Sequence, residues 1–165
     1  MSLIRADTDT IEVARPPLDP QETAAALGAA ENLDELLIAF ALGASFYMRH
    51  VQIYARQRGE LMGYVKIDDG MLDLKQIRAR HFPLDGASLI SRVAAKGEIY
   101  VGPAPDTGPS AAVLAEYDLK AAVDLALVPV ALQGRTFCLA LGHNAETELD
   151  EEVAAALSEL AAATG

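Results

Sequence analysis

Residues 78–105 read RARHFPLDGASLISRVAAKGEIYVGPAP, and this stretch predicts a strand, a tight turn, a helix and a second strand. The first strand is the short extended segment 80–83, which ends at a proline. Asp85 is placed to accept hydrogen bonds from the free N–H groups at the start of the helix. Gly97 can adopt the left-handed conformation that ends a helix. Residues 98–102 then alternate as a strand, so a capped helix separates two strands.

Predicted hairpins flank this stretch on both sides. Residues 50–56 and 60–67 alternate between apolar and polar side chains around a glycine-containing turn, as strands with one buried face do. Residues 123–130 are the most hydrophobic run of the chain, which fits a central strand or a buried helix. The valines of this run favour a strand, and residues 135–142 would pair back against it.

Alternation also assigns the two faces of the strand at residues 50–56. Val51 and Ile53 should face inward. His50, Gln52 and Tyr54 should face water or a partner.

Helix start signals occur at three further places. Asp19 and Glu22 have the spacing of a reciprocal capping box before an alanine-rich helix. Asn32 opens a second helix, with Glu35 in the reciprocal position. Residues 149–164 close the chain as a third helix, with acidic side chains at its start that complement the helix dipole.

Together these elements predict an α+β domain with a mostly antiparallel central sheet of about six strands and helices on its faces. We expect residues 1–18 to be a flexible leader and residues 19–165 to form this single domain. A short helix is expected over residues 110–117. Residues 71–77 remain ambiguous, with a helical turn as one interpretation.

Composition narrows the class of protein. Of the 165 residues, 52% are hydrophobic and 22% are charged, which is ordinary for a soluble globular domain. We expect no membrane partner, since no apolar run approaches the ~18 residues that a spanning helix needs, and no secretory leader. The single cysteine excludes a disulfide framework and favours a reducing, cytoplasmic setting.

The formal net charge of −11 argues against a nucleic-acid partner, which would need a basic face. The charge is uneven: residues 49–96 hold 9 basic and 5 acidic side chains, whereas the rest of the chain is acidic. A solvated sheet face explains these basic residues most simply. The alternative is a surface that binds an anion or an acidic partner.

No catalytic or metal constellation is visible. Cys138 lies in an apolar strand, where a free cysteine usually behaves as a small hydrophobe. The three histidines lack metal-type spacing with one another and with Cys138, so we expect no metal or other cofactor. Ser45 and Ser88 lack the Gly-x-Ser-x-Gly spacing of a nucleophile elbow.

Several segments together carry a resemblance to a known family. They are the strand end FPL at 82–84, YVGP at 100–103, and LVPV at 127–130, which turns into Gly134 and Arg135. Set between two hairpins and a capped helix, they make the chain resemble a GAF domain, a small-molecule sensor module of signalling proteins. PAS-like sensor domains share a related architecture and are the alternative fold.

The resemblance covers roughly residues 19–165 and implies a ligand pocket between one sheet face and the segments 85–95 and 103–117. A mostly apolar pocket needs only a few polar groups to orient a ligand. The candidates on its expected walls are Ser88, Ser91, Tyr100, Asp106 and Tyr117. The alternative is that the serines cap or solvate the helix and the tyrosines pack in the core.

Departures from specialised members limit what the resemblance implies. The chain has no counterpart of the Asn-Lys-Phe-Asp-Glu set of members that bind cyclic nucleotides. Its only cysteine is not where a bilin chromophore would attach, and the several cysteines of members that reduce methionine sulfoxide are missing. We therefore expect no cyclic-nucleotide binding, no bilin attachment and no reduction of methionine sulfoxide.

Two functions fit these observations. The first is a non-catalytic regulatory domain that binds a small molecule or partner and relays binding through its terminal helices to other domains or proteins of a signalling pathway. The second is a ligand-free scaffold that acts by dimerisation or by protein interaction. An enzyme would need a nucleophile–base pair that the sequence does not show.

A homodimer through the terminal helices is expected in either case. Leu33, Leu37 and Phe40 share the core stripe of the helix that begins at Asn32, whereas Ile38 and Leu42 lie outside it. We therefore expect Leu42→Glu to give monomers that remain folded.

Overall fold

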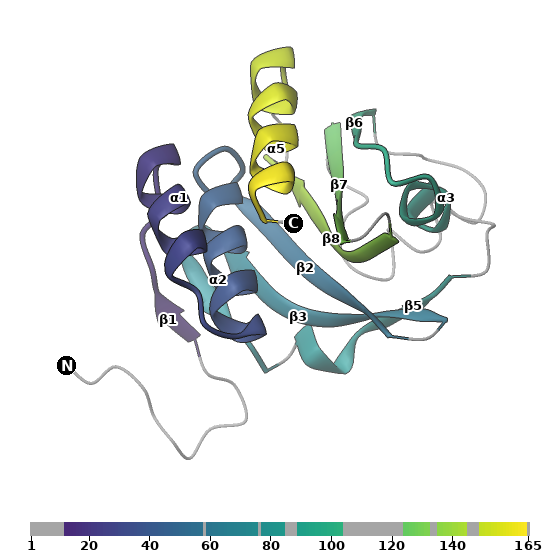
Figure 1. Cartoon of the computed structure of the whole chain (residues 1–165), viewed down its shortest axis with the longest axis horizontal. Coiled ribbons are helices and arrows are strands. Elements are labelled where there is room, and N and C mark those ends of the chain that lie inside the picture. The colour runs from purple at the N-terminus through teal and green to yellow at the C-terminus, as the bar shows by residue number, and fades with distance from the viewer. Residues whose placement is uncertain are drawn as a thin grey trace.

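One antiparallel sheet organises the protein, and helices cover both of its faces (Figure 1). The computed structural model describes residues 12–57, 59–75, 77–84, 89–103, 124–132, 135–144 and 149–164. Within them the sheet has eight strands in the order β1-β4-β3-β2-β8-β7-β6, and β5 pairs with β3 beside this path. The strands are β1 (Glu12–Ala14), β2 (His50–Gln57), β3 (Glu60–Asp68), β4 (Met71–Asp73), β5 (His81–Pro83), β6 (Tyr100–Pro103), β7 (Asp124–Leu132) and β8 (Arg135–His143).

All six expected strands are present, as β2, β3, β5, β6, β7 and β8, and β1 and β4 are additional. The ambiguous segment after residue 70 forms β4, followed by a 3₁₀ turn, η1 (Ile77–Ala79). β1 lies within residues 1–18, the expected flexible leader, and pairs with β4. Without β1, β4 would be an edge strand with unpaired backbone groups, and β1 pairs along this edge. The Arg15 N–H also donates to the Gly70 carbonyl at 2.8 Å.

The helices form two layers. On one side of the sheet lie α1 (Pro20–Ala29), α2 (Leu33–Ala44) and α5 (Glu151–Thr164). On the other side lies α3 (Leu89–Lys96) (Figure 1). No helix among the described residues is long and apolar enough to cross a membrane. The short helix expected over residues 110–117 and the cap at Asp85 lie outside the described residues.

Local capping signals explain where the helices begin and end. The reciprocal capping box of Asp19 and Glu22 is present at α1. At α2 the Asn32 side chain accepts from the Glu35 N–H, but the Glu35 carboxylate accepts from the Glu31 N–H and not from the cap. Gly97 ends α3 with a φ of 70°, in the left-handed region where a residue without a Cβ is unstrained.

Two apolar clusters fill the space between the layers. The larger joins the sheet to α2 and α5, and the smaller joins it to α3. Residues of β7 contribute alternately to both, as the apolar run at 123–130 predicts for a central strand: Leu125 and Leu127 face α3, and Ala126, Val128 and Val130 face α2 and α5.

Two assignments on α2 are wrong. Leu42, expected outside the core, is only 2% exposed, because the chain before α1 crosses it and the Leu18 N–H donates to the Leu42 carbonyl at 3.2 Å. Leu33, expected on the core stripe, is 45% exposed at the first turn of the helix. The helical stripe alone does not reveal which neighbour covers each side of a helix.

Candidate functional site

The sheet face that α3 covers is apolar at one end and polar at the other. At the apolar end, Ile90 and Val93 of α3 pack in one cluster with Tyr54, Leu127 and Leu141 of the sheet. Gln52 lies two residues before Tyr54 on β2, on the same face of the sheet, and it pairs with Leu141 of β8. Polar residues therefore continue the same face beyond the part that α3 covers.

Strand register brings six polar residues together at this end. In one row Asp73, Lys66 and Gln52 are neighbours on β4, β3 and β2. In the next row Asp68, His50 and His143 are neighbours on β3, β2 and β8. We call these residues the polar sheet set: His50, Gln52, Lys66, Asp68, Asp73 and His143.

Asp68 is a centre of this set. One of its carboxylate oxygens lies 2.9 Å from His50 Nδ1, and the other accepts from Lys66 Nζ at 3.0 Å. Partial burial acts to raise the pKa of Asp68, but the hydrogen bonds from His50 and Lys66 outweigh it and lower that pKa overall. The carboxylate is thus held ionised, with His50 and Lys66 oriented around it.

The His143 side chain is neutral at physiological pH. Its ring stacks on that of His50, with centroids 4.7 Å apart, and the residue is only 9% exposed. Burial lowers the pKa of His143 to about 4, and repulsion from His50 and Arg49 adds to this effect against the opposing attraction of Asp68. A neutral imidazole can both donate and accept a hydrogen bond, which suits recognition of a polar ligand.

Gln52 supplies a hydrogen-bond donor on this face. The residue is 6% exposed, and its Oε1 accepts from the Tyr54 hydroxyl at 2.6 Å. Within the described part of the chain, its amide nitrogen makes no hydrogen bond. This nitrogen is not one of the buried side-chain atoms that lack a partner, so it reaches solvent and can donate to a ligand.

The expected exposure of this strand face is wrong. Gln52 and Tyr54 were assigned to water or a partner, but both are buried: Tyr54 packs in the α3 cluster, and its hydroxyl donates to Gln52. Alternation at 50–54 and at 66–68 was the signal that could have found most of the polar sheet set. It could not show that the two strands pair in the register that aligns Lys66 with Gln52.

Two of the five predicted pocket residues lie in the described part of the chain. Ser91 is buried in α3, at 4% exposure. Tyr100 packs against the α3 cluster, and its hydroxyl donates to the Pro103 carbonyl at 2.5 Å. Burial and then Asp124 raise the pKa of Tyr100. Ser88, Asp106 and Tyr117 fall outside the described residues, so the pocket assignment as a whole stays a prediction.

The cysteine and the histidines are the other side chains that the sequence analysis weighed for chemistry. Cys138 is buried in β8, and burial raises the pKa of its thiol to about 12, which keeps it protonated. Among the described residues, no group of three or more His, Cys, Asp or Glu side chains could hold a metal ion.

Comparison with solved structures places this architecture among known folds. The GAF domain of a phosphoenolpyruvate-protein phosphotransferase from Coxiella burnetii matches with a TM-score of 0.68 and 17% identity, over 87% of this chain and 86% of that one. The fold is that of a GAF domain. A methyl-accepting chemotaxis protein matches this chain with a TM-score of 0.70 and 13% identity, over 86% of this chain and 92% of that one.

Enzymes also share the fold. A free methionine-R-sulfoxide reductase from Neisseria meningitidis matches this chain with a TM-score of 0.62 and 16% identity, over 87% of this chain and 82% of that one. These identities establish the fold alone. No model of a known protein family matches the sequence, and no curated protein does either.

Proposed function

We propose that this GAF domain is a non-catalytic regulatory module that binds a small polar molecule on the α3 face of its sheet. The amide nitrogen of Gln52, which donates to no described residue, carries the proposal within the polar sheet set. A ligand that accepts a hydrogen bond from this amide would supply the partner that the described chain does not. The neighbouring apolar floor would bury the rest of a ligand, as in most small-molecule sites.

Strand β2 supplies a route from this site to the helices. Gln52 lies on the α3 face, whereas its neighbours Val51 and Ile53 are fully buried in the cluster with α2 and α5. A ligand that binds one arrangement of β2 better than another would therefore shift the packing of these helices. Such a shift is the signal that other domains or proteins would read.

The state of the single cysteine supports a regulatory role over that of a thiol enzyme. The GAF-fold reductases raise the question of a thiol mechanism. Cys138 is the only cysteine of the sequence, and its buried, protonated thiol is poorly suited to act as a nucleophile. We also propose a cytoplasmic setting, because a chain with a single cysteine and no disulfide framework fits a reducing compartment.

A paired substitution tests the proposal. Changing only Gln52 would leave the Tyr54 hydroxyl without its acceptor, so we choose Gln52→Leu with Tyr54→Phe, which removes both partners. Native mass spectrometry of the purified protein and a metabolite screen by thermal shift would identify a ligand. We expect the double variant to fold and to lose binding by at least about tenfold. Gln57→Leu, at the exposed end of β2, is the matched control and should bind normally.

Two results would contradict this proposal, the first its site and the second its function. One is a double variant that binds an identified ligand as tightly as the unmodified protein, which would place the site elsewhere. The other is a domain that neither carries a ligand nor responds to any metabolite. That second result would favour the alternative, a ligand-free scaffold for dimerisation or protein interaction.

A further inference from the structure

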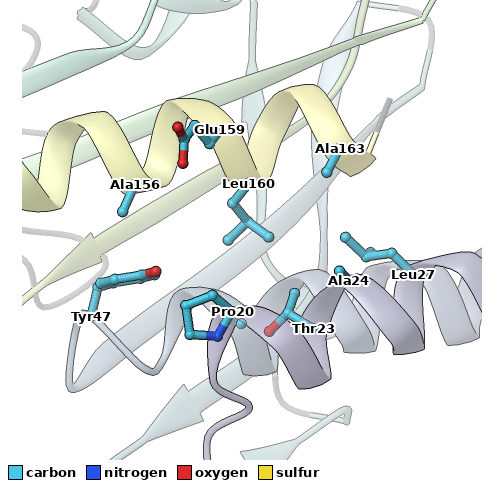
Figure 2. A pocket seen from close by; sticks show the side chains of 10 residues that line it. Pro20, Thr23, Ala24, Leu27, Tyr47, Ala156, Glu159, Leu160 and Ala163 are labelled. Carbon is cyan, nitrogen blue, oxygen red and sulfur yellow. The ribbon is translucent and has the colours of Figure 1, made fainter.

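A cavity of about 170 Å³ opens in the helical layer, on the opposite side of the sheet from the polar sheet set. It lies between α1, the end of α2 and α5 (Figure 2). Its apolar walls include Ala24 and Leu27 of α1 and Leu160 and Ala163 of α5. Its polar groups include Tyr47, which follows α2, and Glu159 of α5.

The cavity as a whole has room for a small hydrophobic group. Engineered apolar cavities of about 150 Å³ accommodate benzene, so this volume suits one aromatic ring or a short branched alkyl group. Gly43 forms part of the lining, and a Cβ there would lie 2.6 Å from a Thr23 side-chain atom and 3.3 Å from Leu160. Thr23 of α1 and Leu160 of α5 therefore both approach α2 at Gly43, beside the cavity.

The polar end is negatively charged. Figure 2 shows Tyr47 and Glu159 toward one end of the cavity, away from the end that holds Leu27 and Ala163. Burial raises the pKa of Tyr47, and the negative charge of Glu159 raises it further, so the hydroxyl stays protonated within the field of the carboxylate. In the described part of the chain, no cationic side chain lies within salt-bridge distance of Glu159.

The whole helical layer shares this sign of charge. The three helices that form it contain no lysine or arginine. Their acidic residues are Glu22, Asp34, Glu35, Glu151, Glu152 and Glu159. A cation is therefore the complementary occupant, and an anion would be repelled.

We infer that this cavity binds a small organic monocation, a protonated amine that carries one compact apolar group. The ammonium lies at Glu159, where the Tyr47 hydroxyl and ring can also contact it. The apolar group lies against Leu27 and Leu160. This site is separate from the one proposed on the α3 face, and binding here would tie α1 to α5.

Isothermal titration with benzylamine near pH 7 tests the inference, and benzyl alcohol is the uncharged probe of similar size. We expect benzylamine to bind and benzyl alcohol to bind at least about fivefold more weakly. Glu159→Gln should weaken benzylamine binding by a similar factor. Ala24→Leu should abolish it, because a longer side chain fills the cavity from an exposed helical position. Glu152→Gln and Ala25→Leu lie on the same helices outside the lining and should change nothing.

Three outcomes would overturn the inference. The first is equal binding of the amine and the alcohol, and the second is an equal effect of Glu159→Gln and Glu152→Gln, which would indicate attraction by overall charge. The third is loss of benzylamine binding in the Gln52→Leu, Tyr54→Phe double variant. That variant should bind the amine normally, and its failure to do so would move the amine to the α3 face without contradicting the regulatory function proposed there.

Discussion

Burial affects His143 and Cys138 in opposite directions on the pKa scale, with the same result for their charge. It disfavours whichever form is ionised, so it lowers the pKa of the imidazole to about 4 and raises that of the thiol to about 12. Both side chains are therefore neutral near pH 7. Of these two residues, only His143 has a shift in pKa that falls in the acidic range, where its effect on stability can be measured.

Folding stability should fall as the pH drops from about 7 to 5 because of His143. Its folded-state pKa of about 4 lies below the ordinary value of 6.5, so the unfolded chain binds the proton more readily in this range. The stability that comes from keeping the imidazole neutral is complete above pH 6.5 and is lost as the pH falls toward 4. At pH 5 the expected loss is about 2 kcal/mol relative to pH 7. Urea denaturation at the two pH values measures it.

His143→Gln should reduce this pH dependence, because glutamine does not titrate. His81→Gln is the control: His81 is exposed, pairs with Glu60 at 3.0 Å, and lies outside the polar sheet set. If the His143 variant retains the full loss between pH 7 and 5, another group causes it. A lowered Asp68 pKa has the same sign but acts at a more acidic pH.

Close contact between β3 and η1 is the tightest element-level constraint near the α3 face. A Cβ built on Gly63 would lie 1.9 Å from the Ile77 carbonyl oxygen, a backbone atom that cannot move alone. The Gly63 N–H donates to the Arg80 carbonyl at 2.8 Å, which fixes the chain on both sides of the 3₁₀ turn. Glycine is thus required here for close approach.

Gly63→Ala should destabilise the domain by about 3 kcal/mol, since β3 and η1 must separate to admit the methyl group. Gly28→Ala is the matched control, because nothing lies within 4 Å of a Cβ at that position of α1. It should stabilise the protein by about 0.5 kcal/mol through helix propensity. Denaturant midpoints at unchanged m-values would measure both effects. Equal effects of the two changes would show that the β3–η1 contact is not tight.

At the scale of the whole molecule, the sheet separates two layers of different character. The α1, α2 and α5 layer is acidic and alanine-rich, whereas the opposite face combines the polar sheet set with α3. Central strands β2, β7 and β8 contribute side chains to both clusters. Binding on either face can therefore alter the packing on the other.

Self-association stays a prediction, but its test must change. Leu42→Glu would bury an unpaired carboxylate and unfold the protomer, because Leu42 is 2% exposed. Leu33 and Phe46, at 45% and 48% exposure, are the large apolar side chains that α2 and its C-terminal end leave in solvent. We expect Leu33→Glu with Phe46→Glu to give folded monomers from a dimer, measured by light scattering after gel filtration. An unmodified domain that is monomeric at high concentration and high salt would contradict self-association.

The sequence determined the parts of the fold that depend on neighbouring residues. The capping box at Asp19 and Glu22, the left-handed end of α3 at Gly97 and the two hairpins follow from short-range backbone chemistry. Together with the doubly apolar run of β7, they were sufficient for the α+β GAF fold with an antiparallel sheet. They did not predict β1, since strand pairing between residues 12–14 and β4 leaves no local pattern.

Only the tertiary structure decided which residues share a site. Register between distant strands aligns Asp73, Lys66 and Gln52, and a shift of one residue would turn every one of these side chains to the opposite face. Burial of Gln52 and Leu42 likewise depends on segments that cross them from elsewhere in the chain. Sequence periodicity reports which side chains lie on one face of an element, but the partner of that face is set by long-range packing.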